Sequence, residues 1–381
     1  CRAVQKKFFF KRAWMQAFDL TLADCTAALR QLAHAKCPGS TGLCAEFYQL
    51  IWPHISQHYW SMLQSAMTSG RLPQSFLQGI ITLIHKRGVC HDLGNYRPIT
   101  LLNADYKILA KALANKMQPM LQAALDPDQT GFVRGRSIKD NAMLTQLLID
   151  RQLLRGEGLI LACCDFHKAY DSLARPFLFD VLQAMGVPAF MRRWATLLYT
   201  DTCAAVLVNG ALSASFPQAS GVRQGCPWAP LLFNCAMEAL CCFLKQDASL
   251  GVPVAGRDGG PPRRLLLSLY ADDTTAFLPD PHQLVTFKQL MRSFGRASGL
   301  ELNAAKTKCM FVASSLSADQ RVQAAAPFRA LDHAAESEPV LGIPIGPPAD
   351  QLHLMHNKVC AAVAVLRRLS GLNLCLLGRS R

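Results

Sequence analysis

The spacing of apolar residues along the chain changes near residue 158, from a mostly helical pattern to one that includes strand-like runs. Up to about residue 155 the pattern is mostly helical, with loops predicted at 37–42 and 85–98. Residues 103–121 carry apolar side chains at helical spacing, and Ser137 to Asp140 fits a capping box before an amphipathic run. From residue 159 onward, short apolar runs typical of buried strands alternate with helical stretches.

The second half of the chain is therefore predicted to mix strands and helices. Strands are predicted over 159–164, 205–208, 212–216, 265–270 and 274–278, with Asn209-Gly210 forming a tight hairpin turn. Helices are predicted from Pro176 to near Gly186, from Pro188 onward, over 230–245 and over 281–298. Because the strands and helices do not alternate steadily, the pattern favours an α+β fold over a doubly wound sheet.

Composition narrows the class of protein. The 381 residues suit two or three subdomains, and 51% of them are hydrophobic, which is enough for a sizeable core. The formal charge of +14 fits a nucleic-acid partner and fits an ordinary basic soluble protein equally well. None of the 15 cysteines forms a C-x-x-C pair, so a structural zinc site of the usual spacing is not expected. No apolar stretch reaches the length of a membrane span.

The most informative residues are three acids at the ends of apolar runs. Asp272 and Asp273 lie between two predicted strands, where a tight turn would expose both carboxylates at the sheet edge. A solvated Asp-Asp turn would explain this pair by itself, and a helix cap would explain Asp165, which ends the strand at 159–164. Together, three such acids can converge on two Mg²⁺ ions about 3.5–4 Å apart, as in phosphoryl transfer by polymerases.

The motifs around these acids occur in a recognisable order. They are DFHKAYD at 165–171, GVRQGCP at 221–227 and YADD at 270–273, with NYRPITL at 95–101 and QTGFVRGR at 129–136 before them and SGLELNAAKTK at 298–308 and VLGIP at 340–344 after them. This set resembles the fingers motifs and the A to E motifs of reverse transcriptases of non-LTR (LINE-type) retrotransposons. The resemblance runs from about residue 75 to 346. Trp228, His85 and Val340 depart from the family's usual residues.

The resemblance implies a right-hand polymerase fold with fingers and palm and a largely truncated thumb. The N-terminal extension and fingers would occupy residues 1–157, and the palm, with part of the fingers and motifs A to E, residues 158–348. The start of the thumb would occupy 349–381. A chain that begins with Cys1 and carries no upstream endonuclease is expected to be a segment of a longer product.

The resemblance also implies which residues form the site. Asp165, Asp272 and Asp273 would bind two Mg²⁺ ions, for which Mn²⁺ can substitute, and Phe166 would flank the first acid beside the nucleotide. Tyr170 would be the steric gate that selects dNTPs, although a core aromatic is the alternative. The remaining assignments are Gln224 and Gly225 beside the incoming nucleotide, Arg97 and Arg136 at its triphosphate, Lys107 as a weaker candidate there, and Lys306 as a general acid. Lys107 and Lys306 could equally be surface lysines, Arg223 could bind phosphate or be structural, and Asp171 is expected to cap or pair locally.

The implied function is RNA-directed DNA polymerisation, with template RNA, a DNA primer and dNTPs as partners and with no membrane partner. The family's life cycle implies a nuclear location, although a cytoplasmic one is also compatible. The alternative is an inactive retroelement fragment that retains only nucleic-acid binding. A group II intron-type maturase is disfavoured by the motifs at 95–101 and 341–344, and a viral RNA replicase by Ala271 and the aromatic gate. The sequence predicts no oligomeric state.

Overall fold

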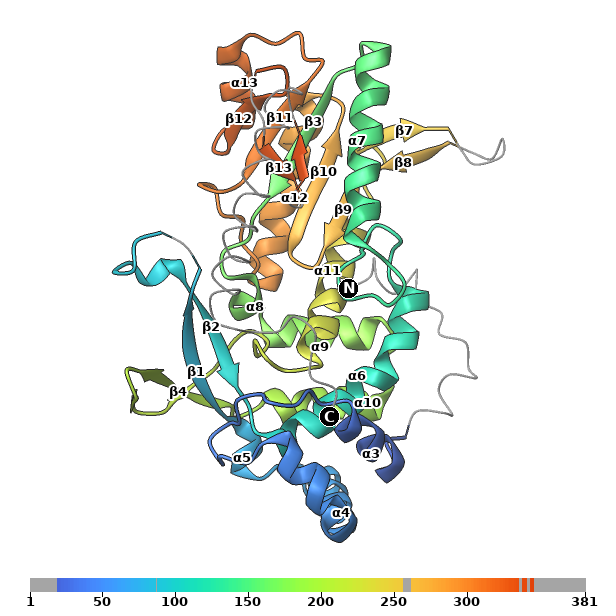
Figure 1. Cartoon of the computed structure of the whole chain (residues 1–381). Coiled ribbons are helices and arrows are strands. Elements are labelled where there is room, and N and C mark those ends of the chain that lie inside the picture. Colours follow the sequence, from blue (N-terminus) through green and yellow to red (C-terminus); the bar gives the residue numbers. More distant parts are fainter. Residues whose placement is uncertain (1–18, 87, 256–261, 336–337, 341–342, 346–381) are drawn as a thin grey trace, which may run out of the picture.

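The fold mixes a helical base with two separate sheets. The computed structural model describes residues 19–86, 88–255, 262–335, 338–340 and 343–345. Helices α3 (Leu22–Arg30), α4 (Ala45–Ser69) and α5 (Gln74–Leu77) form the base in Figure 1. A capping box between Thr21 and Asp24 begins α3, and Gly70 ends α4 in the left-handed conformation that glycine adopts readily.

A first sheet projects from this base, and the sequence pattern missed most of it. Its strands are β1 (Gln78–His85), β2 (Tyr96–Leu101), β4 (Cys203–Val208), β5 (Ala211–Leu212) and β6 (Phe216–Pro217), and the short 3₁₀ helix η1 (Leu93–Asn95) precedes β2. The order β2-β1-β4-β5 puts β2 at an edge, where Pro98 is tolerated. The predicted helical character of the first 155 residues is therefore wrong at β1 and β2, whereas the loop at 85–98 is confirmed except at its ends, which belong to these two strands. Asn209 and Gly210, both with positive φ, form the predicted hairpin turn.

The helices that connect and cover the sheets are mostly those that the pattern predicts. They are α6 (Ala104–Ala124), α7 (Ile138–Arg155), α8 (Ala169–Ser172), α9 (Arg175–Ala184), α10 (Ala189–Tyr199), α11 (Ala229–Leu244), α12 (Pro281–Ser298) and α13 (Ala318–Ala325). The capping box before α7 is confirmed, because Ser137 and Asp140 each accept a backbone N–H of the other. The predicted helix at 281–298 has the bounds of α12.

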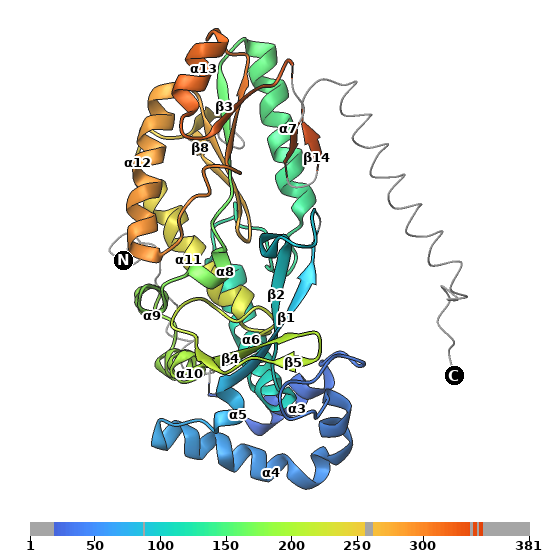
Figure 2. The ribbon, with the colours of Figure 1, turned by 90° about the vertical axis from the view of Figure 1, so that its left-hand side faces the viewer.

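The second sheet carries the acids and has the order β12-β11-β3-β10-β9. Its strands are β3 (Leu159–Cys164), β9 (Leu267–Tyr270), β10 (Asp273–Leu278), β11 (Lys308–Val312) and β12 (Arg329–Asp332). In the central strand β3, Ile160 and Ala162 face the large core on the side of α12, while Leu159 and Leu161 face a smaller core beneath α7. Figure 2 shows α12 on one side of the strands and α7 on the other. Both faces of β3 are thus buried, which explains its continuous apolar run.

Helix α11 runs through the middle of the large core, where all but two of its 16 residues are buried. Trp228, one of the departures from the family pattern, precedes it and is fully buried, with its indole N–H directed at the Met117 sulfur at 3.0 Å. No helix in the described part of the chain is both long and apolar enough to cross a membrane.

Two small hairpins complete the structure, β7 (Val252–Val254) with β8 (Arg263–Leu265) and β13 (Glu338–Val340) with β14 (Ile343–Ile345). The α+β class is confirmed. The predicted start of the thumb at 349–381 lies outside the described residues, and the division between 1–157 and 158–348 stays a prediction.

Candidate active site

The first acid follows the central strand directly. Asp165 is the residue after β3, and its backbone is held from both sides. Its N–H donates to the Thr307 hydroxyl at 3.2 Å, and its carbonyl accepts the Asn303 N–H at 2.7 Å. These contacts leave the half-buried side chain as the part of Asp165 that is free to bind a ligand.

The other two acids lie in the turn between β9 and β10. Tyr270 pairs with Asp273 across the turn, so Ala271 and Asp272 form its two-residue tip. Ala271 has a φ of 56°, which is uncommon for a residue with a side chain, and it is buried. As predicted, the turn brings the paired acids to the sheet edge, with Asp272 half-buried and Asp273 exposed.

A buried glutamine holds this unusual turn. The Gln129 side-chain oxygen accepts the Ala271 N–H at 3.1 Å and the Gly131 N–H at 3.0 Å, and its amide donates to the Ala271 carbonyl at 3.4 Å. Gly131 is packed so closely that a Cβ there would lie 2.3 Å from the Ala271 nitrogen. In the sequence, Gln129 is only one letter of a family motif. No local pattern signals its contact with residues more than 140 positions away.

The three carboxylates share one electrostatic field. Partial desolvation raises the pKa of the Asp273 carboxyl to about 6 although the residue as a whole is exposed, and the negative charges of Asp272 and Asp165 add to the shift. Burial also raises the pKa of Asp272, and Asp165 adds to that shift, whereas the positive charges of Arg97 and Lys86 oppose it. The site therefore concentrates negative charge that its own cations only partly offset.

This donor set fits the chemistry of a magnesium site. Carboxylate oxygens are hard ligands, and a divalent cation would relieve the repulsion that raises these pKa values. As the side chains lie, no group of three or more His, Cys, Asp or Glu residues within the described ranges is arranged to hold a metal ion. The fit rests on donor chemistry and charge.

Tyr170 lies beside the acids on an aromatic support. Its ring stacks on Phe233 with centroids 4.5 Å apart and planes 11° from parallel. Burial raises the pKa of the Tyr170 hydroxyl, and the charge of Asp272 raises it further. The ring thus has a rigid platform next to Asp272, as a residue that contacts a sugar would need.

The GVRQGCP segment at 221–227 connects the first sheet to the acids. The Gln224 carbonyl accepts the Thr100 N–H of β2 at 2.8 Å, and the Gln224 amide donates to both oxygens of Asp171 at 3.1 and 3.2 Å. Gly225 has a φ of 115°, and a Cβ there would lie 2.5 Å from the Thr100 carbonyl oxygen. Glycine is required because β2 approaches this closely. The Asp171 side chain thus pairs with a residue 53 positions away, instead of the local partner that was expected.

The predicted phosphate-binding residues separate into two groups. Arg97 is exposed on β2, and its charge acts on Asp272, so it lies near the acids. Arg136 does not: its guanidinium donates to the backbone carbonyls of Asp126, Gln129, Gln122 and Leu125 at 2.5–3.3 Å. These carbonyls follow or end α6, so Arg136 fixes the segment that carries Gln129. This corrects its predicted place at the triphosphate.

The remaining predicted residues have mixed positions. Lys107 is half-buried, and its amine donates to the Cys37 carbonyl at 3.5 Å in the helical base. Lys306 is exposed on the loop that binds the Asp165 backbone. Phe166 is buried and forms a β-bridge with Leu302 of that loop. Arg223 is structural, since its buried guanidinium donates to the carbonyls of Phe76 and Leu77.

Comparison with known proteins places this geometry in a family. The family model described as "Reverse transcriptase (RNA-dependent DNA polymerase)" matches residues 84–345, which is more than half of the chain. The chain belongs to the reverse transcriptase family. The match covers the acid-bearing sheet, the first sheet except most of β1, and every motif from 95 to 344, so the resemblance drawn from the motifs is confirmed.

Curated relatives assign this reverse transcriptase domain to the non-LTR group. An uncharacterised 149 kDa protein of transposon TX1 from Xenopus laevis is 32% identical over 76% of this chain and 22% of its own length. The Pol polyprotein of retrotransposable element R2 from Popillia japonica is 25% identical over 73% of this chain and 37% of its own. The RNA-directed DNA polymerase of mobile element jockey from Drosophila melanogaster is 24% identical over 72% and 29%. The chain thus spans well under half of each relative.

Among solved structures, a telomerase from Candida tropicalis in complex with a fragment of telomeric RNA aligns with 68% of this chain and 45% of its own. The TM-score is 0.46 and the sequence identity is 13%.

Removing the Gln129 side chain should loosen the turn without unfolding the domain. In Gln129→Ala, the Ala271 N–H loses its acceptor, and losing one hydrogen bond accelerates local opening by about tenfold. Hydrogen exchange of a peptide covering 268–276, followed by mass spectrometry, measures this. Gln289→Ala, at an exposed position on α12, is the control and should exchange like the wild type. Unchanged exchange in Gln129→Ala would contradict the role assigned to Gln129.

The raised pKa of Asp273 makes stability depend on pH. A carboxyl whose pKa rises from 3.8 to about 6 on folding binds its proton more tightly in the folded state, so its stabilising contribution is present below about pH 4 and is lost as pH rises through 6. Asp273→Asn should therefore melt at a higher temperature than the wild type at pH 8 without divalent cations, and at the same temperature at pH 4.

Thermal melts of both proteins test this, with Asp180→Asn on the exposed face of α9 as the control. If Asp273→Asn melted at or below the wild-type temperature at pH 8, Asp273 would not carry the repulsion that the geometry indicates.

Proposed function

We propose that this chain copies RNA into DNA, adding dNTPs to a primer 3′-hydroxyl as the reverse transcriptase domain of a LINE-type retroelement. One observation carries the proposal. Asp165 at the end of β3 and Asp272 and Asp273 in the β9–β10 turn act on one another electrostatically, within the segment that matches the reverse transcriptase family. The activity of the much longer relatives is extended to this chain on that basis.

Asp165, Asp272 and Asp273 would hold two Mg²⁺ ions, with Mn²⁺ as the alternative. When bound, such ions lower the pKa of the attacking hydroxyl and neutralise the pyrophosphate that leaves. The chain's own contribution is to orient the carboxylates and to offset part of the cost of ionising them. Lys86 and Arg97 favour ionisation of Asp272, and the contacts of Thr307 and Gln129 hold the backbones of the two acid segments.

The residues around the acids suit a deoxynucleotide. Arg97 is exposed near Asp272, and its guanidinium can bind phosphate oxygens in a fork. Tyr170, supported by Phe233, would close the space that a 2′-hydroxyl needs, and Gln224 and Gly225 would line the same position. Lys306 would donate a proton to pyrophosphate from the loop next to Asp165.

A cavity beside the catalytic turn suits the template RNA and the DNA primer. It has a volume of about 570 Å³, and its lining includes Lys111, Gln118, Phe132 and Arg134. The Phe132 ring is half exposed and lies 6.5 Å from the ring of Tyr270, which precedes the paired acids. Basic groups beside an exposed aromatic ring are typical of nucleic-acid binding. Synthesis primed at a chromosomal site would require a nuclear location.

Primer extension tests the proposal. On poly(rA)/oligo(dT) with Mg²⁺ and dTTP, Asp272→Asn/Asp273→Asn should lower incorporation by at least about a thousandfold, because removing the cation ligands forfeits several kcal/mol of charge stabilisation. Asp165→Asn should do the same, and Asp180→Asn should retain the wild-type rate. No incorporation by the wild type, with RNA binding retained, would instead favour a fragment that only binds nucleic acid.

Tyr170 should decide the choice of sugar. Tyr170→Val removes the ring and should lower the preference for dGTP over GTP on poly(rC)/oligo(dG) by about tenfold or more, because the site loses its steric exclusion of the hydroxyl. Tyr170→Phe keeps the ring and should keep the preference. If Tyr170→Val selected dGTP as strongly as the wild type, Tyr170 would be a core aromatic and not a gate.

A further inference from the structure

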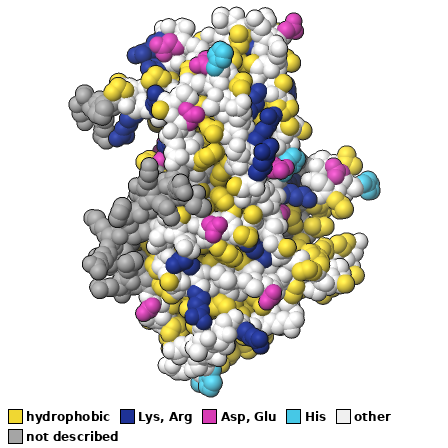
Figure 3. Space-filling view, turned by 180° about the vertical axis from the view of Figure 1, so that it is seen from behind, with side chains coloured by type: hydrophobic (Ala, Val, Ile, Leu, Met, Phe, Trp, Pro, Cys, Tyr) yellow, Lys and Arg dark blue, Asp and Glu magenta, His cyan; other side chains and the backbone are white. Residues whose placement is uncertain are grey.

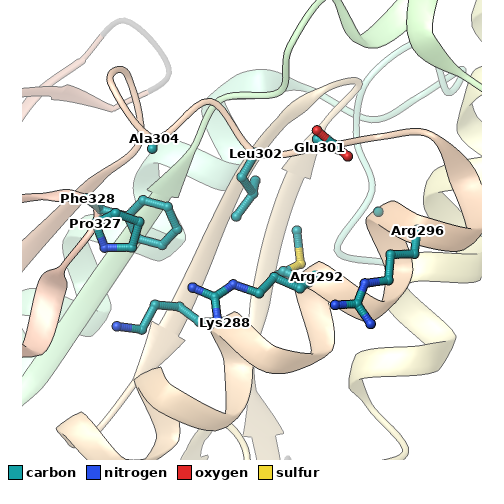
Figure 4. A pocket seen from close by; sticks show the side chains of 10 residues that line it. Lys288, Arg292, Arg296, Glu301, Leu302, Ala304, Pro327 and Phe328 are labelled. Carbon is teal, nitrogen blue, oxygen red and sulfur yellow. The ribbon is translucent and has the colours of Figure 1, made fainter.

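A second cavity lies on the side of the acid-bearing sheet that α12 covers. It has a volume of about 240 Å³ and is enclosed by α12, the segment that follows it and the turn before β12. Figure 4 shows Lys288, Arg292 and Arg296 on one wall, with Pro327, Phe328 and Leu302 opposite them. None of the residues proposed above for catalysis or nucleotide binding lines it.

The cationic wall is built from one face of a helix. Lys288, Arg292 and Arg296 are spaced four residues apart, so they project from successive turns of α12. Figure 3 views the face on which α12 lies and shows a row of Lys and Arg side chains along it. The Lys288 amine donates to the carbonyls of Ala324 and Ala326 at 2.9 and 2.8 Å, which fixes the end of α13. Lys288 therefore has a structural role.

The two arginines are available. Arg292 and Arg296 are exposed, and no hydrogen bond or ion pair joins either guanidinium to another residue within the described ranges. The charge of Arg292 acts on Lys288 and, together with burial, lowers the pKa of that lysine. Among the described residues, no carboxylate is paired with either arginine, so both guanidinium groups can receive an anion.

The opposite wall adds features that a simple anion site does not need. Phe328 and Leu302 are half-buried and present apolar surface to the cavity, and Glu301 lies at one end with an exposed carboxylate. Guanidinium groups bind phosphate in fork geometry, aromatic faces stack on bases, and a carboxylate accepts hydrogen bonds from exocyclic amino groups or a 2′-hydroxyl. These three chemistries together match one nucleotide of a single strand.

We propose that this cavity binds a segment of single-stranded RNA outside the catalytic cleft, with phosphates on Arg292 and Arg296 and one base on Phe328. An acidic peptide would also satisfy the arginines, but it would leave the aromatic face of Phe328 unused. The cavity has about the size of one nucleotide and is too small for a duplex. The inference rests on the proposed function only in naming RNA as the strand.

The wall of this cavity is also the support of the first acid. The carbonyl of Glu301 accepts the His167 N–H at 2.9 Å, and the Asn303 N–H donates to the Asp165 carbonyl at 2.7 Å. An RNA strand held against Leu302 would therefore be separated from Asp165 by a single backbone segment. The cavity would tether the RNA to the polymerase while the cleft is occupied by a primer–template hybrid.

Binding of a short labelled oligo(U) to the full chain, followed by fluorescence anisotropy over a salt series, tests the proposal. Excess unlabelled RNA–DNA hybrid fills the cleft first. Arg292→Ala/Arg296→Ala should weaken binding about tenfold and reduce the salt slope by about 1.4, because each phosphate contact on a single strand contributes about 0.7. Phe328→Leu should weaken binding about fivefold with no change in slope, because stacking releases no counterions.

Matched controls separate RNA binding at this cavity from a general effect of positive charge on RNA binding. Arg71→Ala/Arg193→Ala removes two exposed arginines elsewhere and should bind as the wild type does. Arg292→Lys/Arg296→Lys keeps the charge but loses the fork, and should bind with intermediate affinity. Unchanged oligo(U) affinity in the Arg292→Ala/Arg296→Ala protein, or an equal loss in the control, would overturn the proposal.

Two further results keep the proposal distinct from its alternatives. If poly-glutamate displaced oligo(U) from the wild type as well as unlabelled RNA does, the cavity would be a site for acidic peptides and the proposal would fail. Primer extension on a preformed hybrid should be equal in wild type and variants. Oligo(U) binding is measured without catalysis, so it gives a result even for a chain that extends no primer. Failure of this inference can therefore be told apart from failure of the proposed function.

Discussion

The partial burial of three neighbouring carboxylates is the constraint on which the rest of this structure depends. Their desolvation, with their mutual repulsion added to it, opposes ionisation in the folded chain, as the raised pKa values of Asp272 and Asp273 express. The chain meets this cost with backbone contacts and not with ion pairs to the acids. Thr307 and Asn303 hold the backbone of Asp165, and Gln129 holds the turn before Asp272. The carboxylates therefore keep their position and remain available to cations.

The buried arginines around the segment 221–227 also act through backbone contacts. Arg175 is buried and donates to the carbonyls of Gly221, Ser220 and Tyr199, and burial lowers its pKa to about 10. Arg223 donates to carbonyls before β1. Both guanidinium groups donate to backbone oxygens, although the Arg223 Nε has no partner, and these bonds fix the loop that carries Gln224. Such cations organise the site without neutralising the acids.

How much of the fold the sequence could predict depends on how far apart in the chain the interacting residues lie. The strand at 159–164, the capping box at Ser137 and the helix at 281–298 follow from local periodicity and were predicted with their bounds or close to them. Strands β1 and β2 of the first sheet were missed because they are short, half-buried apolar runs that periodicity cannot tell from helix, whereas β4 was predicted from residue 205 onward.

Contacts that a motif does not reveal, at short and at long range, explain the errors in the site. Arg136 has the residue type that binds triphosphate, yet its guanidinium closes on carbonyls at the end of α6, within 14 residues of itself. Gln129 has no local signature at all, because its partner Ala271 is 142 residues away. A motif reports that a residue matters for the family. Only the fold shows whether it contacts substrate or holds the residue that does.

One segment connects the two faces of the acid-bearing sheet. Residues 301–307 bond the backbone of Asp165 on one side and form the wall of the cavity over α12 on the other. Gly295 permits this arrangement, because a Cβ there would lie 3.1 Å from the Leu300 carbonyl. The segment cannot shift toward either side without disturbing a contact on the other. Since β3 is the central strand, this segment links the proposed RNA site over α12 to the backbone that positions the first acid.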